Sequence, residues 1–204
     1  MRVSRSRICD VLLSVSVALG IVIGGEAAWG ASGGEYAPII EVGANFHTGD
    51  TGKSITGASE YVVSFRAEKR KGRLRPTVAA DLGYARGNAS IGTHSPAFTM
   101  LGAGFLGGVH IFPFTTGRFQ PFFGGSGILG WNFLKLPVPP TGVEPNTQAI
   151  SLGYEISAGV DLRFGNIEGN AIRIHGGMWS ASSSLAAVSG FQLTGFRLTF
   201  GLSY

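Results

Sequence analysis

Apolar and polar side chains alternate without a break along residues 151–164. The apolar positions are Leu152, Tyr154, Ile156, Ala158, Val160, Leu162 and Phe164, and the positions between them include Glu155, Asp161 and Arg163. A period of two predicts a β-strand whose two faces meet different surroundings. Fourteen residues extend roughly 46 Å, and a tilt of about 45° reduces this to roughly 33 Å, close to the hydrocarbon thickness of a bilayer.

The same alternation recurs in seven other segments, and no helical period of useful length accompanies it. The segments lie at about 38–47, 59–68, 75–86, 98–112, 121–133, 170–180 and 190–204. The connections at 48–58, 87–97, 134–147 and 181–189 are long and polar, and those between them are shorter. An even number of strands with short turns at one end and four long loops at the other is typical of outer-membrane barrels. We therefore predict an all-β fold, an eight-stranded antiparallel up-and-down transmembrane β-barrel.

The polar face of these strands is predicted to line the barrel's interior. It consists mostly of small residues with few long charged side chains, which suits a lumen that eight strands leave just wide enough for side chains. Its charges are of both signs, and buried charges are tolerable only when paired. We predict a structural charge network in the lumen, formed by Glu41, Arg66, Asp81, Glu155, Asp161, Arg163, Arg173 and Arg197. A soluble lipocalin-like barrel, with these charges outward, is the alternative.

Aromatic residues recur toward the strand ends, as the interfacial girdles of membrane barrels require. They are Phe46, Tyr84, Phe98, Trp131, Phe133, Phe164, Trp179 and Tyr204.

The composition differs from that of soluble domains and indicates that much of the surface does not face water. Charged residues make up 14% of the sequence, below the roughly 25% of soluble domains, and 33 of the 204 residues are Gly. The net charge is +4, and the basic residues gather at 69–75 without aromatic neighbours, which argues against nucleic acid. We interpret this run as a solvated turn, with contact to anionic lipid head groups or lipopolysaccharide as the alternative.

The beginning of the chain has the features of a secretory signal peptide. Arg2, Arg5 and Arg7 precede an apolar run at 11–23 that is too short to span a bilayer as a helix. We predict a signal peptide over residues 1–30, cleaved at about 28–31, followed by the barrel at 31–204. Cys9 lies within it and is the chain's one cysteine, so the mature chain has no thiol chemistry.

Two stretches give the chain a family likeness. GFRLTFGLSY at 195–204 resembles the terminal signal that the outer-membrane barrel assembly machinery recognises, and FQPFFGGSGILGWNF at 119–133 resembles the small Gly-rich barrels of the OmpA, OmpX and opacity-protein type. The resemblance implies a bacterial outer-membrane location, a monomer, and outer-membrane lipid and lipopolysaccharide as partners. It also assigns the assembly signal to Phe196, Leu198, Phe200, Leu202 and Tyr204.

No motif in the sequence predicts catalysis, a cofactor or a metal. HTGDTGKS at 47–54 approaches a phosphate-binding loop, but His47 stands where Gly is needed and no helix is predicted to follow. His47, His94, His110 and His175 are dispersed, with no metal-ligand spacing. We expect His110 and His175 to hydrogen-bond within the charged lumen.

The predicted function is therefore a structural or surface-interaction role, with a plugged lumen and four external loops, and not an enzyme. A narrow channel for small or apolar solutes and a lipid A-modifying outer-membrane enzyme are the alternatives.

Overall fold

The computed structural model describes residues 35–48, 59–88, 97–135, 146–164, 170–185 and 188–203. The chain divides after Tyr36 into two units, and the second unit, 37–204, forms the barrel. The predicted signal peptide lies outside the described residues, as does most of the predicted connections at 48–58, 87–97 and 134–147.

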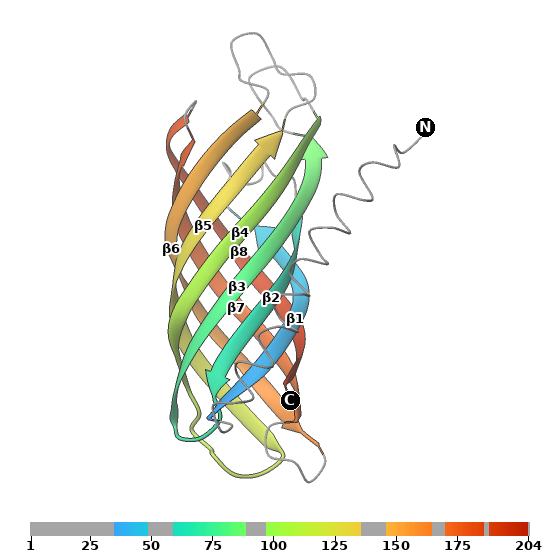
Figure 1. The fold of residues 1–204 in the computed structure, drawn as a ribbon, viewed down its shortest axis with the longest axis vertical. Coiled ribbons are helices and arrows are strands. Elements are labelled where there is room, and N and C mark those ends of the chain that lie inside the picture. The colour runs from blue at the N-terminus through green and yellow to red at the C-terminus, as the bar shows by residue number, and fades with distance from the viewer. Residues whose placement is uncertain are drawn as a thin grey trace, which may run out of the picture. The chain divides into compact units, whose positions relative to one another are not determined.

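Eight antiparallel strands form a closed barrel in which each strand pairs with its neighbours in sequence (Figure 1). The barrel closes between β1 and β8, where Ile39 pairs with Ser203 and Phe46 with Phe196. Closure leaves no open sheet edge, so that every strand has two partners. The strands are β1 (Tyr36–His47), β2 (Ser59–Lys69), β3 (Leu74–Asn88), β4 (Ala97–Ile111), β5 (Phe119–Lys135), β6 (Asn146–Arg163), β7 (Ala171–Leu185) and β8 (Val188–Ser203).

The predicted fold class and strand count are confirmed, and the largest difference concerns the connection predicted at 181–189. β7 continues to Leu185 and β8 begins at Val188, so only two residues separate these strands. The Ser-rich end of β7 looks like a loop in the sequence. In the barrel its backbone pairs with β6 on one side, where Ser183 lies opposite Ser151, and with β8 on the other. Pairing on both sides therefore outweighs the weak strand propensity of serine.

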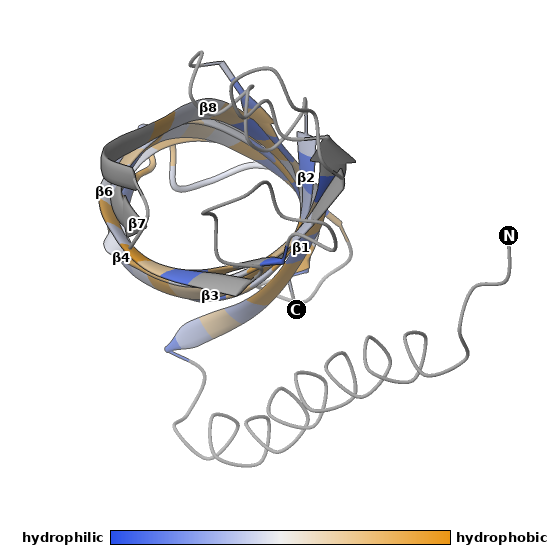
Figure 2. Cartoon of the chain, turned by 90° about the horizontal axis from the view of Figure 1, so that it is seen from above, coloured by the Kyte–Doolittle hydropathy of each residue, from blue (hydrophilic) through white to orange (hydrophobic). Residues whose placement is uncertain are grey.

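The two faces of the strands have the predicted orientation. Large apolar side chains cover the outside, and Phe105, Ile156 and Met178 expose 65–71% of their surface. The charged positions of the same strands point into the ring of strands that Figure 2 shows from above, and Arg173 there exposes 1%. A charged interior and an apolar exterior are the reverse of a lipocalin-like soluble barrel, so that alternative is wrong.

Glycines on the interior face let large side chains cross the lumen. A Cβ at Gly159 would collide with the ring of Phe122 and with the carbonyl oxygen of Ile174. By contrast, a Cβ at the outward-facing Gly107 would meet no atom within 4 Å. Glycine is therefore needed for packing at the interior position 159, whereas the outer position 107 has room for a larger side chain.

One aromatic residue departs from the predicted girdles. Trp179 points inward, exposes 9%, and packs its ring edge against His47 at 5.3 Å between centroids. Side chains alternate between the two faces of a strand, and Trp179 is an even number of residues from both His175 and Arg173. It therefore points into the lumen, as they do. Phe46, Tyr84, Trp131, Phe133 and Phe164 are exposed as predicted, and the side chains of Phe98 and Tyr204 lie outside the described ones. The described residues contain no helix long and apolar enough to cross a membrane.

Candidate functional site

The barrel's interior contains a charged network, and Arg173 on β7 is the best-connected side chain in it. Its Nε and Nη2 donate hydrogen bonds to the two carboxylate oxygens of Asp161 on β6, at 2.7 and 2.8 Å. Its Nη1 and Nη2 also donate to Glu68 on β2, at 3.1 and 2.8 Å. The guanidinium lies 4.6 Å from the centroid of the Phe122 ring. Arg173 thus links β6, which pairs with its own strand, to β2, which lies across the lumen.

Glu68 has two further contacts in this layer. Its Oε2 hydrogen-bonds with Nδ1 of His110 on β4, and its Oε1 lies 3.9 Å from Nη1 of Arg75 on β3. Arg75 is held mainly by other groups, since its guanidinium lies 3.7 Å from the centroid of the Phe112 ring and Nη2 donates to Gln120 Oε1 at 3.3 Å. The layer therefore connects six strands, β2 to β7, through side chains alone.

His175 on β7 connects β1 and β6 in the next layer. Nδ1 lies 3.3 Å from Glu41 on β1, and Nε2 lies 3.4 Å from Glu155 on β6. Arg66 on β2 donates from Nε to Glu41 Oε2 at 3.2 Å and from Nη1 to the Thr77 hydroxyl at 3.2 Å. His175 is fully buried, and its charged surroundings include these two carboxylates and Arg66.

Arg197 on β8 organises the layer nearest the long connections. Nη1 lies 2.6 Å from Asp81 on β3, and Nε lies 3.4 Å from Glu155. Nε also donates to Asn45 Oδ1 at 2.9 Å, and Nδ2 of Asn45 donates to Glu60 at 2.9 Å. Glu60 therefore receives one amide hydrogen bond instead of a direct arginine contact.

Burial makes these contacts energetically important. The described interior holds six buried carboxylates and four buried arginines, and His110 and His175 can supply the remaining positive charges when protonated. An ionised group in such a site is costly without a partner, and pairing offsets most of that cost. The geometry can hold the barrel walls together and fill the lumen with side chains. The described part of the network does not present a nucleophile beside a base.

The structure brings together seven of the eight residues predicted for the network. Glu41, Arg66, Asp81, Glu155, Asp161, Arg173 and Arg197 are all buried and joined as described. Arg163 differs, because it ends β6 at the mouth of the barrel, is half-buried, and has no ion pair with a described residue in the network. Its place at the strand end, where the lumen opens, explains the difference.

Sequence reasoning missed Arg75, which it assigned to a solvated turn. Arg75 exposes 3% and belongs to β3, where it shares the inward face with Thr77 and Asp81. The even spacing of these three residues, which puts them on one face of a strand, was the signal that could have placed Arg75 inside. Charge clustering at 69–75 hid this signal, because Arg75 looks like the end of the turn.

Part of the network lies between two cavities at opposite ends of the described interior. A cavity of about 280 Å³ opens at the end where β2 turns into β3, and a cavity of about 80 Å³ lies near His47, Glu60 and Trp179 at the other end. The two cavities share no lining residue, and His110, Phe122 and His175 lie between them, each exposing 2% or less. Among the described residues, no group of three or more His, Cys, Asp or Glu is arranged to hold a metal ion.

A closed barrel with an apolar outer surface and an ionised, packed interior defines a class of protein. It is a membrane-spanning β-barrel of the bacterial outer-membrane type, since only a closed barrel satisfies every backbone group of a sheet in lipid.

Comparison with known proteins gives a fold likeness and no family. Neisserial surface protein A has a similar structure, with 16% identity over 82% of this chain and 94% of its own, and a TM-score of 0.49. A major outer membrane protein from Thermus thermophilus has 12% identity over 83% of this chain and 98% of its own, and a TM-score of 0.38. No family model matches the chain, and no curated protein matches it.

Proposed function

We propose that the protein is a monomeric outer-membrane barrel of the OmpA, OmpX and opacity-protein type, with a structural and surface-interaction role. The observation that carries the proposal is the opposite character of the two barrel faces. Ile156, exposed to 65%, and Glu155, exposed to 2%, are adjacent in sequence and lie on opposite sides of the same wall. Hydrocarbon outside and ion pairs inside account for both values.

The packed interior supports a structural role in preference to transport. Arg173 and His175 each reach carboxylates on two strands, and a pore along the axis would have to break these contacts. The role we assign to the network is to stabilise the barrel and to keep the lumen closed. The apolar outer surface of the barrel contacts outer-membrane lipid. The barrel end that carries the long connections faces lipopolysaccharide and the surroundings of the cell.

Fractionation of cells combined with gel migration tests the location. The protein should be recovered with the outer membrane and should migrate differently before and after boiling, because an unboiled barrel stays folded in detergent. Recovery in the periplasmic fraction would refute the proposal.

Planar-bilayer recording tests the closed lumen. We expect no steady conductance from the wild-type protein, because the charged layers fill the interior. A steady open level would instead favour a channel. Mass analysis of lipid A from cells with and without the protein should show no change, and a lost acyl chain would identify an enzyme.

A further inference from the structure

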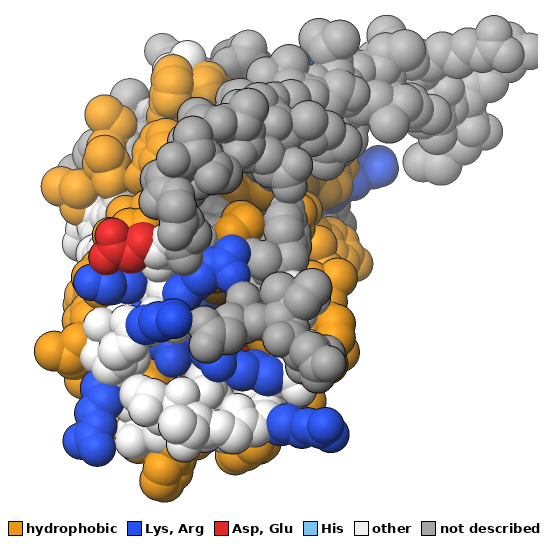
Figure 3. All heavy atoms as spheres, turned by 60° about the horizontal axis from the view of Figure 1, so that its bottom comes forward, with side chains coloured by type: hydrophobic (Ala, Val, Ile, Leu, Met, Phe, Trp, Pro, Cys, Tyr) orange, Lys and Arg blue, Asp and Glu red, His pale blue; other side chains and the backbone are white. Residues whose placement is uncertain are grey.

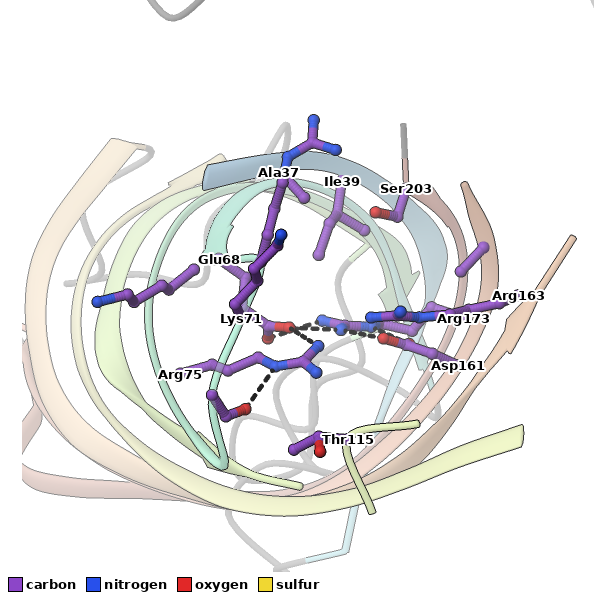
Figure 4. Close-up of a pocket in the computed structure, with 14 residues that line it drawn as sticks. Ala37, Ile39, Glu68, Lys71, Arg75, Thr115, Asp161, Arg163, Arg173 and Ser203 are labelled. Carbon is purple, nitrogen blue, oxygen red and sulfur yellow. Dashed lines mark hydrogen bonds and ion pairs between the residues drawn. The ribbon is translucent and has the colours of Figure 1, made fainter. Parts of the chain in front are cut away.

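The cavity of about 280 Å³ at the end where β2 turns into β3 has an unusual lining. It opens at the barrel end that carries the short turns at 70–73 and 112–118, and its volume of about 280 Å³ far exceeds what one water needs. Figure 4 shows Lys71, Arg75, Arg163 and Arg173 around this opening, with Thr115 at its edge. The cationic groups that line it are Lys69, Arg70, Lys71, Arg75, Arg163 and Arg173.

Positive charge exceeds negative charge in this lining. Six cationic residues face two carboxylates, Glu68 and Asp161, so the formal charge of the lining is six minus two, or +4. Both carboxylates accept hydrogen bonds from Arg173, the innermost of the six cations. The other five surround the opening, and Figure 3 shows Lys and Arg side chains gathered over this end of the barrel. Cations concentrated in one concave site attract anions.

The position of Arg75 is fixed before any ligand arrives. Nε donates to the Gly72 carbonyl oxygen at 3.1 Å, and the guanidinium lies against the Phe112 ring. The turns that frame the opening are also tied to their neighbours, since Phe112 N donates to the Arg73 carbonyl oxygen at 2.7 Å and Arg163 N donates to that of Arg118 at 2.8 Å. Groups held in place lose little freedom on binding, which favours affinity.

We propose that this cavity binds a phosphate-bearing ligand. Arginine guanidinium groups match phosphate oxygens in pairs, and lysines add point charges, so a site with several of each favours a group with more than one negative charge. The cavity holds a diphosphate-sized group with the surrounding water. The phosphate can belong to a soluble compound or to the head group of a lipid in the adjacent leaflet.

The test uses the full chain folded in uncharged maltoside micelles, with inorganic pyrophosphate as the probe and titration calorimetry as the measurement. We expect saturable binding of one pyrophosphate per chain, weakened by added NaCl because salt screens the charges. Arg163→Gln and Lys71→Gln should each reduce the affinity by on the order of tenfold, as expected for the loss of one charge-assisted contact.

Arg86→Gln is the matched control, because Arg86 is an exposed arginine toward the other end of β3 and does not line the cavity. Migration of unboiled samples establishes that each variant is folded. Absence of saturable binding in the wild-type protein would overturn the proposal, and so would equal losses in Arg86→Gln and the two cavity variants.

The source of the phosphate is resolved by repeating the titration in nanodiscs. If pyrophosphate binds more weakly in discs of phosphatidylcholine and phosphatidylglycerol than in discs of phosphatidylcholine alone, at a NaCl concentration that screens the surface charge of the discs, the anionic lipid head group occupies the site. Equal affinities assign the site to a soluble phosphate compound. The periplasmic position of the cavity rests on the proposed outer-membrane function, whereas binding in micelles does not, so the two proposals can fail separately.

Discussion

Removing the guanidinium of Arg173 tests the physical basis of the barrel's stability. Arg173 donates hydrogen bonds at 2.7, 2.8, 2.8 and 3.1 Å to Asp161 and Glu68, and it exposes 1% of its surface. Arg173→Met keeps much of the side-chain volume and leaves both carboxylates without their main partner. Breaking a buried ion pair costs about 3–5 kcal/mol, because the remaining charge stays desolvated. We expect the free energy of unfolding to fall by at least that much.

Arg163→Met is the matched control, since the same substitution at the mouth removes no ion pair with a described residue. It should change the free energy of unfolding by about 0.5 kcal/mol or less, as surface substitutions usually do. Urea titrations in lipid vesicles, followed by tryptophan fluorescence and by gel migration of unboiled samples, give both values under one condition. Similar losses in the two variants, within about 1 kcal/mol, would refute the reasoning.

A double variant distinguishes the free energy lost with the contact from the cost of the carboxylate left unpaired. Asp161→Asn removes one of the two carboxylates that Arg173→Met leaves unpaired. The double variant should therefore be more stable than the sum of the two single effects predicts, by about 0.5–3 kcal/mol, the usual range for residues in direct contact. Strict additivity would show that Asp161 and Arg173 contribute independently.

Three further predictions concern the outer surface, the glycines and assembly. Ile156→Arg, in the middle of β6, should lower the free energy of unfolding in vesicles by about 2–4 kcal/mol. Phe119→Arg, at the start of β5, should lower it by about 1 kcal/mol or less. Equal losses would contradict a barrel whose middle is surrounded by hydrocarbon. Gly159→Ala should lower the urea midpoint because its methyl group collides with the Phe122 ring, whereas Gly107→Ala should leave the midpoint unchanged or raise it. Phe200→Ser should reduce the amount of protein inserted in the outer membrane of cells while refolding in detergent stays normal, and unchanged insertion would argue against the assembly signal at this position.

The alternation of side chains was sufficient to predict the strands and their two faces. Period two is a local property, so each strand could be found from its own residues, as in β6, where Glu155 and Ile156 face opposite sides. The assignment of the charged face to the lumen followed from its small residues and balanced charges. The end of β7 could not be found in this way, because its serines become a strand only by pairing with β6 and β8.

The partners of the buried charges were decided by the closed barrel. Arg173 and Glu68 lie 105 positions apart in the sequence and on strands that do not pair, and they meet because closure and strand stagger set their walls at the same height. The same geometry places Arg75 in the lumen, where a turn was expected, and Arg163 beside the opening instead of within the network. The sequence therefore determined which charges face inward along most strands, because that depends on neighbouring residues alone. The tertiary structure decided which of them pair and where a cationic cavity remains, because both depend on distances across the barrel.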